Sequence, residues 1–156
     1  MLDTRPLLLK TNFPPISRNQ LHTLQVNVGY LCNLSCTHCH VYAGPTRKEQ
    51  MALETVDLIL QFIKARNIRI LDLTGGAPEM NEHFRYLVRE ARKLGVEVID
   101  RCNLIILNEE GYEDMADFLA EEKVVVTASL PCYEESNVEQ QRGKGVYNGS
   151  MEALRK

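Results

Sequence analysis

The sequence predicts an α/β fold in which four parallel strands alternate with helices. Three observations support this prediction. Short segments rich in branched apolar residues alternate with longer segments in which apolar residues recur at helical spacing. Polar residues recur at every second position of the expected strands, which places them on one face of a sheet. Three of the five cysteines lie in one short stretch, directly after the first expected strand.

The first half of the chain begins irregularly and then becomes regular. Residues 1–22 are expected to form an irregular N-terminal extension, because Pro6, Pro14 and Pro15 interrupt regular backbone. Residues 24–30 are expected to form the first strand. Residues 49–66 are expected to form the first helix, since apolar side chains recur there at Met51, Val56, Ile59, Leu60 and Ile63.

The middle of the chain repeats the strand and helix pattern. Residues 68–76 predict a strand that runs into a pair of glycines. Residues 81–95 predict a helix, with Asn81 as a cap at its start and Gly95 at its end. A strand over 96–107, a helix over 111–123 and a strand over 124–131 follow.

The expected elements end with a loop over 132–149 and a last helix that begins at residue 150. Alternating strands and helices indicate βαβ units, in which parallel strands are joined by right-handed crossovers. Strands covered on both faces are almost wholly apolar, and these are not. Their polar positions are Gln25 and Asn27, Asp72 and Thr74, Arg101 and Asn103, and Thr127 and Ser129.

We call these eight side chains the polar row. Parallel strands bring their carboxyl ends to one edge, where α/β folds build ligand sites. The polar row is therefore expected to line a ligand site at that edge. The alternative is a sheet face that is simply exposed to water.

Composition excludes several classes of function. The 156 residues suffice for one domain of ordinary size, and the net charge is −3 with no basic patch of the kind that binds nucleic acid. No apolar run approaches the ~20 residues of a membrane span. The N-terminus does not resemble an export signal, so we expect a cytoplasmic protein whose cysteines stay reduced.

The clustered cysteines predict a metal centre. Their spacing is Cys-x3-Cys-x2-Cys, at Cys32, Cys36 and Cys39. Haem attachment through Cys36, Cys39 and His40 normally needs export and leaves Cys32 unexplained. A zinc site that adds His38 or His40 is an alternative, although structural zinc sites usually use two separated ligand pairs. An iron–sulfur cluster fits best, because a 4Fe–4S cluster normally takes four thiolates and three would leave one iron open.

This spacing, on a loop after the first strand of an α/β chain, resembles the radical S-adenosylmethionine (SAM) superfamily. The resemblance implies a partial (β/α)6 barrel, a 4Fe–4S cluster on the three cysteines, and SAM bound at the open iron. It implies reductive cleavage of SAM to methionine and a 5′-deoxyadenosyl radical. The implied cofactor-binding residues are Gly75, Gly76, Glu79, Asn103, Ser129 and Arg142, with Arg142 pairing with the SAM carboxylate. Ala77 and Pro78 separate Glu79 from the glycines, unlike the usual family pattern.

Longer strings resemble the radical SAM proteins of arsenosugar biosynthesis: "LQVNVGYLCNLSCTHCHVYAGP", "LDLTGGAPEMN", "IDRCNL" and "ASLPCY". The resemblance implies that the radical adds to a dimethylated trivalent arsenic compound. Because trivalent arsenic binds thiols, Cys102 and Cys132 are candidate catalytic residues at the strand ends. A small organoarsenical substrate and an electron donor such as a flavodoxin or ferredoxin are the expected partners.

Relatives in that family are longer, so residues 23–156 are expected to be the N-terminal part of a radical SAM domain, about four βα units long and truncated. Two functional classes remain open from the sequence. One is a radical SAM enzyme, and the other is a non-catalytic iron–sulfur or electron-transfer module, or an inactive fragment.

Overall fold

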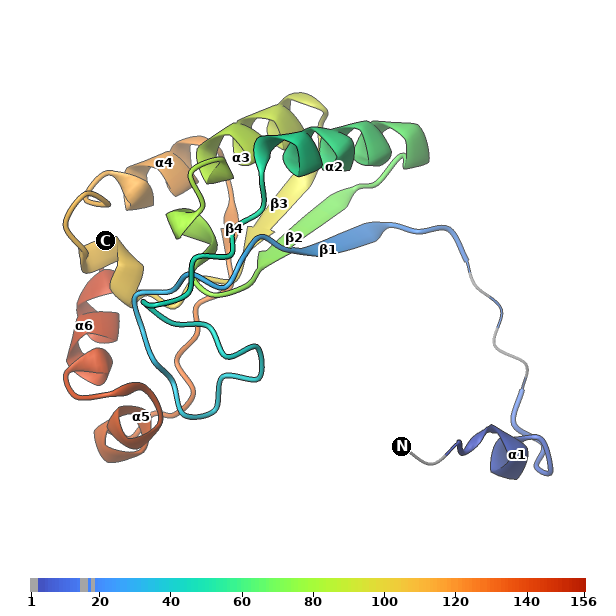
Figure 1. Cartoon of the computed structure of the whole chain (residues 1–156), viewed down its shortest axis with the longest axis horizontal. Coiled ribbons are helices and arrows are strands. Elements are labelled where there is room, and N and C mark those ends of the chain that lie inside the picture. Colours follow the sequence, from blue (N-terminus) through green and yellow to red (C-terminus); the bar gives the residue numbers. More distant parts are fainter. Residues whose placement is uncertain (1–2, 15–16, 18) are drawn as a thin grey trace.

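The computed structural model describes residues 3–14, 17 and 19–156. In this part of the chain, one sheet contains the parallel strands β1 (Thr23–Asn27), β2 (Ile70–Thr74), β3 (Glu97–Asp100) and β4 (Val125–Val126), in that order. Helices α2 (Leu53–Arg66), α3 (Phe84–Lys93) and α4 (Met115–Glu121) lie along one face of the sheet (Figure 1). The predicted α/β class and the four parallel strands are confirmed, and the arrangement is that of part of a βα barrel wall.

The hydrophobic core lies between the sheet and these helices. Leu71 and Leu73 of β2 and Val98 of β3 are fully buried, and they pack in one cluster with side chains from α2 and α3 such as Ile63 and Phe84. Burial of one such side chain contributes about 1.5–3 kcal/mol. The apolar face of each strand is therefore fixed against the helices, which leaves the polar row on the opposite face.

The strands are shorter than the sequence predicts. β1 ends at Asn27, whose Oδ1 accepts a hydrogen bond from the Gly29 amide at 2.9 Å and so bends the chain. β3 ends at Asp100, and a 3-10 helix η2 (Ile105–Asn108) replaces the end of the expected strand after Leu104 adopts a φ of 70°. Beyond β4, the amide of Ser129 still donates to the Cys102 carbonyl at 2.9 Å, so pairing continues toward the carboxyl edge.

Two helix starts also differ from the prediction. α2 begins at Leu53 because the preceding residues are bonded to the segment after β1, with the Met51 amide donating to the Val28 carbonyl at 2.9 Å. A short 3-10 helix, η1 (Pro78–Met80), precedes α3. Asn81 joins the two, since its Nδ2 donates to the Val28 carbonyl at 2.9 Å and its Oδ1 accepts from the His83 amide at 2.8 Å. Gly95, with a φ of 77°, directly follows the end of α3, as predicted.

The predicted loop over 132–149 is wrong. This segment holds α5 (Glu135–Arg142), and α6 (Val146–Ala153) begins earlier than residue 150. α5 escaped prediction because Val138 is its one buried side chain, so apolar periodicity is absent. Both helices lie at the carboxyl end of the sheet (Figure 1), where they close the site described below.

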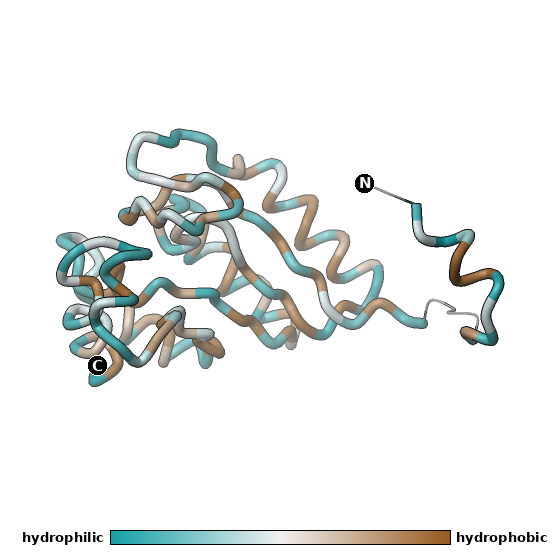
Figure 2. The backbone as a smooth tube through the Cα atoms, turned by 90° about the horizontal axis from the view of Figure 1, so that it is seen from below, coloured by the Kyte–Doolittle hydropathy of each residue, from teal (hydrophilic) through white to brown (hydrophobic). Residues whose placement is uncertain are grey.

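In the described part of the N-terminal extension, the one helix or strand is a single helical turn, α1 (Arg5–Leu8). Pro6 lies in the first turn, where its missing N–H removes no helical hydrogen bond. Figure 2 shows a hydrophobic, brown stretch of backbone in this segment. The side chains of Leu7 and Leu9 in α1 and directly after it are exposed. Among the described residues, every helix is too short or too polar to cross a bilayer.

Candidate functional site

The three clustered cysteines lie on a loop that begins directly after β1. Backbone bonds between Cys32 and Gly44 (3.3 Å) and between Gly44 and Tyr30 (3.0 Å) close the base of this loop. Its tip is bonded to the end of α5, where the Thr37 amide donates to the Gln141 carbonyl at 2.9 Å. The loop is thus anchored at both ends, which holds the thiols in place at the carboxyl edge of the sheet.

Gly75 and Gly76 let the cysteine loop lie directly on the end of β2. The Gly76 amide donates to the Gly29 carbonyl at 3.0 Å, and the Ala77 amide donates to the Leu31 carbonyl at 2.9 Å. A Cβ at Gly76 would collide with the Leu31 backbone, and Gly75 has a φ of 141°. The glycine pair has a packing role here, and both residues also line the cavity described next.

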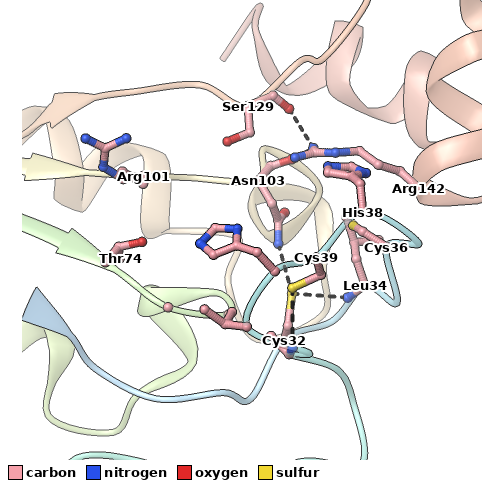
Figure 3. Close-up of a pocket in the computed structure, with 15 residues that line it drawn as sticks. Cys32, Leu34, Cys36, His38, Cys39, Thr74, Arg101, Asn103, Ser129 and Arg142 are labelled. Atoms are coloured by element: carbon pink, nitrogen blue, oxygen red, sulfur yellow. Dashed lines mark hydrogen bonds between the residues drawn. The ribbon is translucent and has the colours of Figure 1, made fainter. Parts of the chain in front are cut away.

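A cavity of about 290 Å³ opens between the cysteine loop and the strand ends (Figure 3). It brings together residues from five separate segments of the chain. Its lining includes all three clustered cysteines and five of the six predicted cofactor-binding residues: Cys32, Cys36, Cys39, Gly75, Gly76, Asn103, Ser129 and Arg142. Thr74 and Arg101 of the polar row line it as well, which matches the predicted site at this edge.

The thiols are surrounded by hydrogen-bond donors. The Cys32 Sγ accepts from the Leu34 amide at 3.4 Å and from Asn103 Nδ2 at 3.7 Å, and the Cys39 Sγ accepts from the Ala43 amide at 3.3 Å. Burial raises the pKa of Cys32 and of Cys36, although the nearby Arg142 acts to lower that of Cys36. Without a metal the Cys32 and Cys36 thiols therefore stay protonated, and metal binding must displace their protons.

The donor set fits an iron–sulfur cluster better than a single zinc ion. Tetrahedral thiolates on one zinc lie about 3.8 Å apart, given Zn–S bonds of about 2.3 Å. Among the described residues, one group of three potential metal ligands has all of its ligand atoms within 4.8 Å of one another, and it consists of Glu79, Asp100 and Cys102. The sulfur atoms of the three loop cysteines do not form such a compact group. Their N–H donors suit a thiolate-ligated cluster, whose potential such bonds tune.

Asn103 and Arg142 connect the loop to the sheet. Asn103 Nδ2 also donates to Asn33 Oδ1 at 2.7 Å, so its side chain bridges the end of β3 and the cysteine loop. Arg142 Nη1 donates to the carbonyl oxygens of Ser129 (2.6 Å) and Asn103 (3.4 Å), as the dashed line to Ser129 in Figure 3 shows. Ser129 therefore lies at the cavity with its carbonyl oxygen already occupied.

The polar row forms a hydrogen-bonded chain across the open face of the sheet. Asp72 accepts from Gln25 Nε2 at 2.8 Å and pairs with Arg101 through two bonds of 2.8 Å, from Nε to Oδ1 and from Nη2 to Oδ2. The hydrogen bonds from Arg101 hold the pKa of Asp72 below its usual range, and those from Asp72 raise the pKa of Arg101. Both groups are therefore charged across the physiological range.

Glu79 and Cys102 do not lie where the sequence analysis expected. Both are buried on the helix side of the sheet, together with Asp100, and neither lines the cavity. The reason is strand alternation: Arg101 and Asn103 face the cavity, so Cys102 between them faces the core. Cys102 therefore lacks the access that an arsenic ligand needs, and Glu79 lacks the access that a SAM contact needs.

Glu79 and Asp100 form an unusual pair of buried acids. As carboxylates, their four oxygens have no hydrogen-bond donor among the described residues. Burial raises the pKa of Glu79, and burial together with the charge of Glu79 raises the pKa of Asp100 well above its usual range. Burial raises the pKa of Cys102 too, so its thiol stays protonated. A proton shared between the two acids satisfies the pair.

Cys132 lies outside the cavity lining, just before α5. Its half-buried Sγ accepts weak hydrogen bonds from the Glu134 amide at 3.5 Å and from Asn137 Nδ2 at 3.6 Å. The sequence analysis placed Arg101 in the polar row and considered His38 and His40 as zinc ligands, but it assigned no role to Asp100. His38 and His40 sit within the cysteine motif and line the cavity, which their position on the loop already indicated.

The chain is similar to known proteins over most of its length. The family model described as the radical SAM superfamily matches residues 26–156. The sporulation killing factor maturation protein SkfB of Bacillus subtilis is 26% identical over 125 residues, which cover 80% of this chain and 30% of that protein. A GTP 3′,8-cyclase of Rhizobium meliloti is 32% identical over 96 residues, which cover 58% of this chain and 27% of that protein.

A solved structure shares the fold. The crystal structure of SuiB from Streptococcus suis matches with a TM-score of 0.69 at 15% sequence identity, over 87% of this chain and 30% of that one. Another SuiB structure, determined with bound S-adenosylmethionine, matches with a TM-score of 0.64. The chain spans about 30% of the length of SkfB and 27% of that of the cyclase.

Proposed function

Because this chain belongs to the radical SAM superfamily, we propose that Cys32, Cys36 and Cys39 hold a 4Fe–4S cluster and that the cavity beside them binds SAM. The observation that carries the proposal is the convergence of the three loop thiols on one cavity lined by strand ends. When bound, such a cluster supplies the electron that cleaves SAM into methionine and a 5′-deoxyadenosyl radical. A small electron-transfer protein such as a flavodoxin or ferredoxin is the proposed source of that electron.

The residues of this chain would position the cofactors. The Leu34 amide and Asn103 Nδ2 donate to the Cys32 sulfur and stabilise it as a thiolate. Gly75 and Gly76 expose backbone at the cavity wall, where a side chain would block both the loop and a ligand. Arg142, with Nη1 anchored on two carbonyl oxygens, is placed to pair with the SAM carboxylate.

We further propose a dimethylated trivalent arsenic compound as the acceptor of the 5′-deoxyadenosyl group. The support is the similarity of four sequence strings to the arsenosugar-forming proteins, all of which contribute residues at or beside the cavity. Cys132 is the remaining thiol candidate for contact with arsenic, because it is half-buried whereas Cys102 is enclosed. Mass spectrometry of a reaction with dimethylarsinous acid tests this: an adduct of arsenic and deoxyadenosine supports it, and release of 5′-deoxyadenosine alone contradicts it.

Anaerobic reconstitution followed by electron paramagnetic resonance (EPR) tests the core of the proposal. The reduced chain should give a 4Fe–4S signal that changes when SAM is added. Cys36→Ser should lose this response, whereas Cys132→Ser, a matched thiol outside the loop, should keep it. A cluster signal that ignores SAM would favour the non-catalytic electron-transfer alternative, and full loading of Cys36→Ser would remove the proposed ligand set.

A further inference from the structure

We propose that Arg101 forms an anion-binding subsite in the cavity, and that the substrate binds it through an oxyanion, which for the arsenical proposed above is the deprotonated As–OH oxygen. The inference rests on the proposed function, because it assigns a substrate group to the same cavity. It goes further by naming the chemical class that the far end of the cavity selects.

The first observation is the charge of the cavity lining. Among its fifteen residues there are two arginines and two histidines, and there is no aspartate or glutamate. The single carboxylate near this wall, that of Asp72, already pairs with Arg101. The three cysteines become anionic when they bind the cluster, so an anion is favoured at the Arg101 end of the cavity, where it meets N–H donors and no carboxylate of the lining.

The two arginines are not equivalent. Arg142 uses its Nη1 on the carbonyl oxygens of Ser129 and Asn103, and its Nε is buried without a hydrogen-bond partner among the described residues. Arg101 uses only the Nε and Nη2 edge of its guanidinium, on Asp72. Within the described residues, Arg101 Nη1 has no hydrogen-bond partner, and the side chain is 46% exposed. Arg101 thus presents a free N–H edge to the cavity.

Arg101 is also held in place before any ligand arrives. Asp72, whose side chain is 8% exposed, grips the guanidinium through two parallel hydrogen bonds and is itself held by Gln25. A planar guanidinium fixed in this way loses little conformational entropy when it binds an oxyanion. Two rigid elements, β2 and the end of β3, therefore define the position of the subsite.

The location distinguishes this subsite from the cofactor end of the cavity. Figure 3 shows Arg101 and Thr74 at the strand side, while the three cysteines and Arg142 lie on the opposite side. A molecule that reacts near the cysteines and extends along the open face of the sheet would bring its far end to Arg101. Because SAM would be held beside the cysteines and Arg142, we assign Arg101 to the substrate.

Titration calorimetry of the reconstituted chain with inorganic phosphate and with dimethylarsinate tests the subsite. Both oxyanions should bind, and Arg101→Gln should weaken both at least tenfold while SAM affinity changes less than threefold. Arg101→Lys should have an oxyanion affinity between those of the wild type and Arg101→Gln, since it keeps the positive charge and loses the planar guanidinium. Arg89→Gln removes a comparably exposed, ion-paired arginine outside the cavity and should change nothing.

Loss of Arg101 leaves the Asp72 carboxylate buried without its partner. A second variant therefore tests whether any loss of binding comes from misfolding. The double variant Asp72→Asn/Arg101→Gln replaces the ion pair with neutral amides and should show the same loss of oxyanion binding at a wild-type melting temperature. Unchanged oxyanion affinity in both variants would overturn the proposal, as would the absence of oxyanion binding to the wild type. A loss confined to SAM affinity would reassign Arg101 to the cofactor carboxylate. Failure of the proposed function can be told apart from failure of the Arg101 subsite. It would appear as an EPR signal of the wild type that does not respond to SAM.

Discussion

Replacing Glu79 with Gln should reduce a pH-dependent loss of stability in this chain. Glu79 and Asp100 are buried together, and the pKa of each is raised, first by burial. In the unfolded chain both acids titrate near pH 4. The folded form therefore holds protons that the unfolded form has released, so stability is full below about pH 4 and falls as pH rises through the raised native pKa values.

The size of the effect follows from proton linkage. Each proton held only by the folded state changes the unfolding free energy by about 1.4 kcal/mol per pH unit. We take one proton to be shared between Glu79 and Asp100 in the folded form. At every pH where the unfolded form has released this proton and the folded form still holds it, the free energy of unfolding of the wild type should fall by up to about 1.4 kcal/mol per pH unit. Glu79→Gln removes the charge of Glu79 but not the burial of Asp100, so the native pKa of Asp100 should be raised less and the loss of stability should end at a lower pH than in the wild type.

Urea unfolding of the chain without metal, followed by circular dichroism at pH 5, 7 and 9, measures the difference. The free energy of unfolding of Glu79→Gln should exceed that of the wild type by a margin that grows toward pH 9. Glu82→Gln is the matched control, because the Glu82 side chain is 80% exposed on the same segment and should leave the pH profile unchanged. Parallel profiles of wild type and Glu79→Gln would refute the shared proton. Cys102 and Tyr112, the other titratable groups beside Glu79, are retained in every variant.

Three further outcomes follow from the site. Gly76→Ala should prevent cluster loading, measured as iron per chain, because its Cβ meets the Leu31 backbone; Gly111→Ala, at an open turn where an added Cβ meets no other atom, should load normally. Asn103→Ala should shift the midpoint potential of the cluster to a more negative value in an EPR-monitored redox titration, since Cys32 loses a hydrogen bond; an unchanged potential would contradict this. Iodoacetamide under native conditions should label Cys132 and spare Cys102, and equal labelling would contradict the burial of Cys102.

Much of the fold followed from the sequence because alternation and helical periodicity are local. The polar row was predicted from spacing alone, and the structure confirms it as the chain from Gln25 through Asp72 to Arg101. The same alternation also places Cys102 on the opposite face. The sequence analysis did not apply it to Cys102 and predicted this thiol beside the site. Helix α5 was missed because Val138 is its one buried side chain, and its bond to the cysteine loop uses the backbone of Gln141, for which the side-chain pattern carries no signal.

The sequence predicts site residues that belong to one short motif. It does not predict whether a residue outside that motif faces the cavity or is buried in the core. Cys32, Cys36 and Cys39 share one loop, so their convergence needs no tertiary information. Glu79 follows the glycine pair closely in sequence, yet the turn of η1 carries its side chain beneath the sheet edge to Asp100. Only the packed structure separates a carboxylate that faces a ligand from one that faces the core.

The central claim is that three thiolates hold a cluster and leave one iron without a protein ligand. Mössbauer spectroscopy of the chain, reconstituted anaerobically with an iron isotope active in that method, tests it most directly. The account predicts one iron site distinct from the other three, whose parameters change when SAM is added. Four equivalent, thiolate-ligated irons that do not respond to SAM would contradict it.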